Sequence, residues 1–80
     1  MAIKRTLKVD AYLTQLNEIK NYFEKMQATR ENTYENRSEN WQESEKGETE
    51  QENIDALEAI NEKLSEAYDE LEELFDESMI

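Results

Sequence analysis

Hydrophobic residues recur along the first half of the chain at alternating steps of three and four positions. The residues that share this spacing are Val9, Tyr12, Leu16, Ile19, Phe23 and Met26. The period is typical of an α-helix with one buried face, and Leu13 and Tyr22 widen the stripe. The later part of the helix is more polar, but no proline or glycine interrupts it before Gly47. We therefore predict one long helix over residues 10–45, with Asp10 as its N-cap.

The second half of the chain carries a stripe of the same period. Its members are Leu57, Ile60, Leu64, Ala67, Leu71 and Leu74. Ile54, Tyr68 and Phe75 lie alongside it. This pattern predicts a second helix over residues 49–78, and hence an all-α fold.

Gly47 separates the two stripes and is the only glycine in a chain without proline. A glycine can adopt the left-handed conformation that ends many helices. Thr49 and Glu52 have the spacing of a capping box, which would begin the second helix. We predict a turn over residues 46–48, and therefore an antiparallel helical hairpin over residues 10–80.

A fold at Gly47 also sets which residues face each other, and it brings Phe23 near Leu71 and Trp41 near Ile54. Trp41, the only tryptophan, has two interpretations. It is either a binding anchor, because tryptophan is frequent at interfaces, or a cover for the turn end of the core. We favour the second.

Both stripes are wider than the seam between two helices requires. The residues left on the flank of an isolated hairpin are Leu13, Tyr22, Tyr68 and Phe75. An exposed apolar flank usually marks an association surface. We expect a homodimer in which two hairpins form a coiled-coil-like four-helix bundle, with docking on another protein as the alternative.

Residues 1–9 form a basic N-terminal arm in which apolar and polar residues alternate. The arm is either flexible or a helical extension, or it is a short strand. As a strand it would resemble the DNA-contacting ribbon of ribbon-helix-helix dimers, although a net charge of −12 opposes that role. The arm lacks the apolar run of a signal peptide, and no stretch approaches a membrane span. We expect a soluble, cytoplasmic protein.

Eighty residues make one small domain, and the chain contains neither cysteine nor histidine. It therefore lacks disulfides, thiolate metal ligands and the usual general base. We expect no metal and no cofactor. An enzyme is the least expected class, because carboxylates need an enclosing pocket to shift their pKa values for catalysis.

Charge is distributed unevenly. Residues 1–41 hold seven Lys/Arg and six Asp/Glu, whereas residues 42–80 hold two Lys/Arg and fifteen Asp/Glu. This imbalance opposes direct binding of nucleic acid or anionic lipid and favours a protein partner with a basic surface.

Acidic residues cover one face of the predicted second helix. The candidate partner-binding residues are Glu58, Glu62, Glu66, Asp69, Glu70, Glu73 and Glu77. Residues 50–77 contain twelve acids over ~42 Å, or about one per 3.5 Å, similar to the ~3.4 Å per phosphate of one DNA strand. The face is either a solvated surface that aids solubility or a mimic of a nucleic-acid backbone.

Small acidic helical proteins of phages and mobile elements show a similar segment. The likeness lies in Tyr34-x-x-Arg37-Ser38-Glu39-x-Trp41-Gln42-Glu43-Ser44-Glu45-x-Gly47 and the acidic helix after it. In charge and size the chain is also similar to phage-encoded inhibitors that occupy nucleic-acid sites on host defence proteins. The acidic face predicts a non-enzymatic inhibitor or accessory factor that presents this face to a basic partner, and a phage-encoded protein of this kind would act in the host cytoplasm. A homo-oligomeric scaffolding protein is the alternative.

Overall fold

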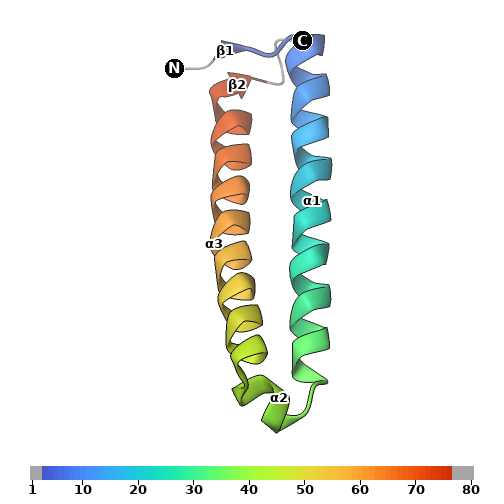
Figure 1. Cartoon of the computed structure of the whole chain (residues 1–80). Coiled ribbons are helices and arrows are strands. Elements are labelled where there is room, and N and C mark those ends of the chain that lie inside the picture. Colours follow the sequence, from blue (N-terminus) through green and yellow to red (C-terminus); the bar gives the residue numbers. More distant parts are fainter. Residues whose placement is uncertain (1–2, 77–80) are drawn as a thin grey trace.

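Two long antiparallel helices lie side by side in the computed structural model, which describes residues 3–76 (Figure 1). In chain order the elements are β1 (Ile3–Lys4), α1 (Leu7–Glu35), α2 (Glu39–Glu43), α3 (Glu45–Leu74) and β2 (Phe75–Asp76). The molecule measures 56 × 19 × 13 Å, and α1 packs against α3. The predicted all-α helical hairpin is confirmed, although its turn and its helix ends differ. Within residues 3–76, no helix combines the length and the apolar character that crossing a bilayer requires.

The first helix begins one turn earlier than predicted. Thr6, and not Asp10, is the N-cap of α1, because its Oγ1 accepts a hydrogen bond of 3.1 Å from the Val9 amide. Asp10 lies in the first turn of α1, where a carboxylate interacts favourably with the positive end of the helix dipole. Residues 7–9 of the predicted arm are therefore helical, while Ile3–Lys4 form a strand. Both interpretations of the arm were thus right for different residues.

The prediction of a continuous helix over residues 10–45 is wrong, because α1 ends at Glu35. The chain turns through residues 36–38, and Ser38 caps the short helix α2 by accepting a hydrogen bond of 3.2 Å from the Trp41 amide. Gln42 also stabilises the turn through two hydrogen bonds. Its Nε2 donates to the carbonyls of Tyr34 at 2.9 Å and Arg37 at 3.1 Å. A polar side chain thus satisfies carbonyl groups that the end of α1 leaves without a helical partner.

The predicted turn over residues 46–48 is also wrong, since Gly47 lies in the first turn of α3. Its φ is not positive, and its amide donates to Ser44 Oγ, the N-cap, at 3.2 Å. A Cβ at this position would overlap the carbonyl oxygens of Trp41 and Gln42. The glycine therefore permits the close approach of α2 to the start of α3. Thr49 makes no capping box, because its Oγ1 donates to the Glu45 carbonyl at 2.9 Å.

The earlier turn shifts the register between the long helices. Asn61 Nδ2 in α3 donates to the Phe23 carbonyl at 3.1 Å and to Gln27 Oε1 at 2.7 Å in α1. Phe23 therefore lies opposite Asn61, about three helical turns from the predicted Leu71.

The core along this seam is thin. Only two apolar side chains among the described residues are buried, Leu13 at 6% and Ile54 at 3% exposure. Asn61 is also buried, at 5% exposure, opposite Phe23. No member of either apolar stripe is fully buried; each is half-buried or exposed.

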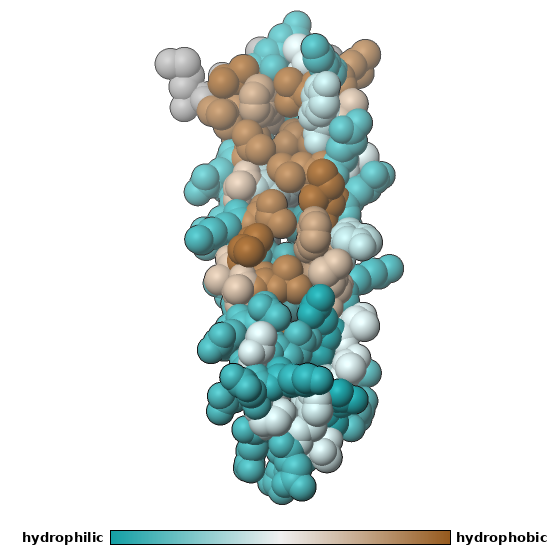
Figure 2. All heavy atoms as spheres, in the orientation of Figure 1, coloured by the Kyte–Doolittle hydropathy of each residue, from teal (hydrophilic) through white to brown (hydrophobic). Residues whose placement is uncertain are grey.

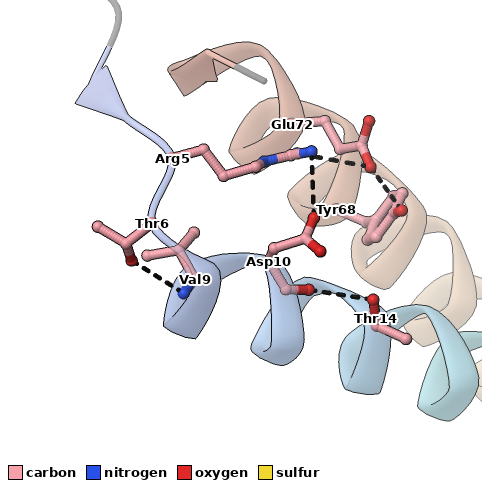
Figure 3. Close-up of polar contacts among 7 residues, drawn as sticks. All are labelled: Arg5, Thr6, Val9, Asp10, Thr14, Tyr68 and Glu72. Atoms are coloured by element: carbon pink, nitrogen blue, oxygen red, sulfur yellow. Dashed lines mark hydrogen bonds and ion pairs between the residues drawn. The ribbon is translucent and has the colours of Figure 1, made fainter. Parts of the chain in front are cut away.

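The two strands lie at the end of the hairpin opposite to α2 (Figure 1). We call this end the open end, because no turn joins the two long helices there. β1 pairs with β2 in parallel, with Ile3 opposite Phe75. Arg5 follows β1 and is buried, and its guanidinium lies 3.6 Å from Asp10 and 3.7 Å from Glu72 (Figure 3). These contacts tie the start of the chain to both long helices.

Candidate functional site

The first candidate site is a row of carboxylates on α3, which we call the carboxylate ridge. Its members, all exposed, are Glu58, Glu62, Glu66, Asp69, Glu70 and Glu73. The structure thus brings six of the seven predicted partner-binding residues to one surface, and the seventh, Glu77, lies outside the described residues. Within residues 3–76, no ridge carboxylate lies in an ion pair.

Three basic side chains pair with acids outside the ridge. Arg30 Nη1 contacts both carboxylate oxygens of Glu50 at 2.9 and 3.1 Å and so joins α1 to α3. Lys20 Nζ pairs with Glu24 Oε1 on its own helix at 3.0 Å. Arg5 approaches Glu72, which is in α3 but outside the ridge. Lys63 lies next to the ridge in α3, but within the described residues it forms no ion pair with a ridge carboxylate. The ridge therefore carries more negative charge than this one lysine can offset.

The ridge opposes folding of α3. Carboxylates four residues apart lie next to each other on a helix, as they do at 58/62, 62/66, 66/70 and 69/73. Each such pair costs about 0.2–0.5 kcal/mol, so the four together cost roughly 1–2 kcal/mol. Stability alone does not explain why the chain concentrates its acids there.

The second candidate site is an apolar surface that spans both long helices, which we call the apolar face. Its exposed members are Tyr12, Ile19 and Tyr22 on α1 and Ile60 and Leu74 on α3. Figure 2 shows hydrophobic side chains gathered across both helices toward the open end, while the end with α2 is hydrophilic. At 3.6 residues per turn, this face lies about 130° from the ridge around the axis of α3.

The predicted self-association residues fit this surface only in part. Tyr22 lies on the apolar face and is 60% exposed. Leu13 is buried against α3, so its assignment to an exposed flank was wrong. Tyr68 and Phe75 are half-buried near the open end.

Sequence reasoning placed the other exposed members of the apolar face in the seam between the helices. Tyr12, Ile19, Ile60 and Leu74 all belong to the predicted core stripes. Their spacing marks them as apolar helix positions, but it does not say which edge of a wide stripe packs inward. The observed register decides that.

The third feature lies at the turn. The rings of Trp41 and Tyr34 meet edge to face with centroids 6.0 Å apart, and the Arg37 guanidinium lies 4.1 Å from the centre of the Trp41 ring. They border an open hollow of about 690 Å³ together with Lys46 and Glu50. Both aromatic rings are half-buried, as expected of residues that cover the turn end of the core.

Among residues 3–76, no group of three acidic side chains lies close enough to hold a metal ion. The pKa of Tyr68 is raised, first by its hydrogen bond to Glu72 and then by burial. That hydrogen bond sits at the open end, outside any enclosed cleft described above.

No family model matches the chain, and no curated protein or solved structure matches it. Function is therefore inferred from the ridge and the apolar face themselves.

Proposed function

We propose that the chain is a non-enzymatic protein-binding module that presents its carboxylate ridge to a basic surface of another protein. One observation carries this proposal. Six exposed carboxylates follow one helix without an ion pair in the described part of the chain, and the stretch of α3 from Glu58 to Glu73 contains a single basic residue, Lys63. A basic partner would supply the cations that the ridge lacks and would offset its internal repulsion.

The spacing of the ridge supports mimicry of a nucleic-acid backbone. Glu58 and Glu73 are ~22 Å apart along α3, so the six carboxylates follow each other at roughly one per 4 Å. One strand of DNA carries a phosphate every ~3.4 Å. A groove lined with lysine and arginine for such a strand would also attract this ridge.

In charge and size the chain is similar to phage-encoded inhibitors that occupy nucleic-acid sites on host defence proteins, and this likeness favours a nucleic-acid-binding host defence protein as the partner. An acidic inhibitor in the host cytoplasm would occupy the nucleic-acid site of such a protein. The proposed role is therefore an inhibitor or accessory factor that competes with nucleic acid.

The test is a triple substitution on the ridge, Glu66→Gln, Glu70→Gln and Glu73→Gln. The partner is first captured from the native cell with the unaltered chain, and its affinity is then measured across a salt series. We expect the triple variant to bind at least ten times more weakly, because three charge–charge contacts are lost, and to respond less steeply to salt.

A matched control removes the same charge away from the ridge, at the exposed residues Glu18, Glu35 and Glu43. It should change the affinity less than about twofold, because rim or distant charges contribute little. Equal affinity of the ridge variant and the unaltered chain would refute a role for the ridge.

A second candidate function is a homo-oligomeric helical bundle that acts as a structural or scaffolding protein. The exposed apolar face favours it, because contiguous apolar surface on a small protein usually marks an association site. In that case the ridge triple variant would keep its full activity.

A further inference from the structure

The described hairpin lacks the core that a stable single domain needs. Only Leu13 and Ile54 are buried apolar residues in the described part, whereas the five members of the apolar face are 40–60% exposed. A chain of this size buries too little surface to be more than marginally stable by itself. A second layer over the apolar face would supply the missing burial.

The size of the apolar face suits another hairpin. Ile60 and Leu74 lie ~21 Å apart along α3, and the face crosses both helices, a width of 19 Å. Its projected area is therefore ~400 Å², at the level of the largest apolar patches on monomers. Self-pairing removes at least ~800 Å², and interdigitating side chains raise this toward the ~1,200–2,000 Å² of stable interfaces.

The shape of the apolar face is also suited to a helical partner. Ile19, Tyr22 and Phe23, together with Gln15 and Glu18, border a shallow hollow of about 360 Å³ on α1. Helices pack by inserting side chains of one into such depressions of the next. Exposed Ile60 and Leu74 on a second copy have the size to fill it.

We propose that the apolar face binds a second copy of the chain, with α1 of each copy against α3 of the other and both turns at the same end. This inference rests on the second candidate function and specifies the face, the occupant and the orientation. It is independent of what the ridge binds.

Charge selects this orientation. α1 carries four basic and five acidic side chains, whereas α3 carries two basic and twelve acidic ones. Placing α1 over the partner's α3 sets a nearly neutral helix against an acidic one. The other two-fold arrangement, with turns at opposite ends, would set the two acidic helices against each other, which like-charge repulsion disfavours.

The ridges remain accessible in such a bundle. Because each ridge lies about 130° from the apolar face, pairing of the faces directs the two ridges away from each other. The dimer then carries two separate binding surfaces on opposite sides, and it does not merge them into one double row.

The first experiment is light scattering of the full chain over a range of concentrations. We expect a mass of about 19 kDa, twice the 9.5 kDa of one chain, and a midpoint of thermal unfolding that rises with concentration. A mass of 9.5 kDa with a concentration-independent midpoint overturns the proposal.

Two neighbouring substitutions then test the face. Ile60→Lys places a charge on the apolar face, and Ala59→Lys places the same charge on an exposed position beside it. Lysine lowers the net negative charge, so a loss of dimer cannot be assigned to greater repulsion. We expect Ile60→Lys to raise the dissociation constant at least tenfold, whether the monomer stays folded or unfolds, and Ala59→Lys to have little effect. A dimer that Ile60→Lys leaves unchanged overturns the assignment of the face.

A distance measurement tests the orientation. The chain has no cysteine, so Glu43→Cys at the exposed end of α2 introduces a single site for a spin label. With both turns at one end, the two labels lie roughly 20–30 Å apart, whereas turns at opposite ends separate them by about 60 Å. The longer distance overturns the proposed arrangement. Loss of partner binding by a dimer of the expected shape would count only against the role of the ridge.

Discussion

Tyr68 and Glu72 show how single residues secure the open end of the hairpin (Figure 3). Tyr68 Oη donates a hydrogen bond of 2.6 Å to Glu72 Oε1, the oxygen that also lies 3.7 Å from the Arg5 guanidinium. This hydrogen bond raises the pKa of Tyr68 above its ordinary value of 10.0, and burial and the charge of Glu72 act in the same direction. The folded chain therefore favours the neutral phenol.

A dependence of stability on alkaline pH follows from this shift. Below pH 10 the phenol is neutral in both states, so its contribution to the free energy of unfolding is fully present. Above that value the unfolded chain loses the proton first, and stability falls as the pH rises through the higher pKa of the folded state. Urea unfolding from about pH 8 to about pH 11 should show a smaller loss for Tyr68→Phe than for the unaltered chain.

Identical curves for Tyr68→Phe and the unaltered chain would contradict the assigned hydrogen bond.

The junction of α2 and α3 governs the arrangement of the elements. Ser44 ends α2 and caps α3, and Gly47 allows the carbonyls of Trp41 and Gln42 to pass close to the first turn of α3. In an ordinary helix, replacing glycine by alanine stabilises by about 0.5–1 kcal/mol. Here the added methyl group has no room.

We therefore expect Gly47→Ala to lower the free energy of unfolding by about 1–3 kcal/mol, the usual cost of overpacking. Urea unfolding measures this change. Glu48→Ala, at the next and exposed position, should change the free energy of unfolding by less than about 0.5 kcal/mol, because the gain in helix propensity offsets the lost interaction with the helix dipole. A stabilised Gly47→Ala variant would show that α2 does not pack as described.

The same junction explains which elements the sequence could predict. The three–four spacing of apolar residues identifies both long helices, because each has to bury one stripe. The turn escapes such reasoning, since residues 36–38 contain neither glycine nor proline and are held by the side chains of Ser38 and Gln42. Glycine is typical of a helix end, but Gly47 lies inside α3, where it permits a close contact with α2.

The sequence predicts the carboxylate ridge better than it predicts the apolar face. The ridge carboxylates are exposed in almost any register, because they lie far from the apolar stripe of α3. The members of the apolar face depend on the register. With the turn misplaced, Leu13 was predicted to be exposed and Tyr12 and Ile60 to be buried, whereas the structure shows the reverse. A contact between the helices, such as that of Asn61 with Phe23, was needed to correct the register.

The whole molecule separates two kinds of surface. An apolar face covers one side toward the open end, and an unpaired carboxylate ridge follows another side of α3. This separation lets the chain associate through one surface while it offers the other to a basic partner. Salt should act oppositely on the two, because it screens repulsion between the acidic hairpins and weakens attraction to the partner.

The central claim is that the ridge occupies a site made for nucleic acid. A competition measurement tests it most directly, with the captured partner, labelled chain and the nucleic acid that the partner binds. The account predicts mutual exclusion, in which added nucleic acid displaces the chain and the Glu66/Glu70/Glu73→Gln variant fails to compete. A ternary complex that holds chain and nucleic acid together would contradict it.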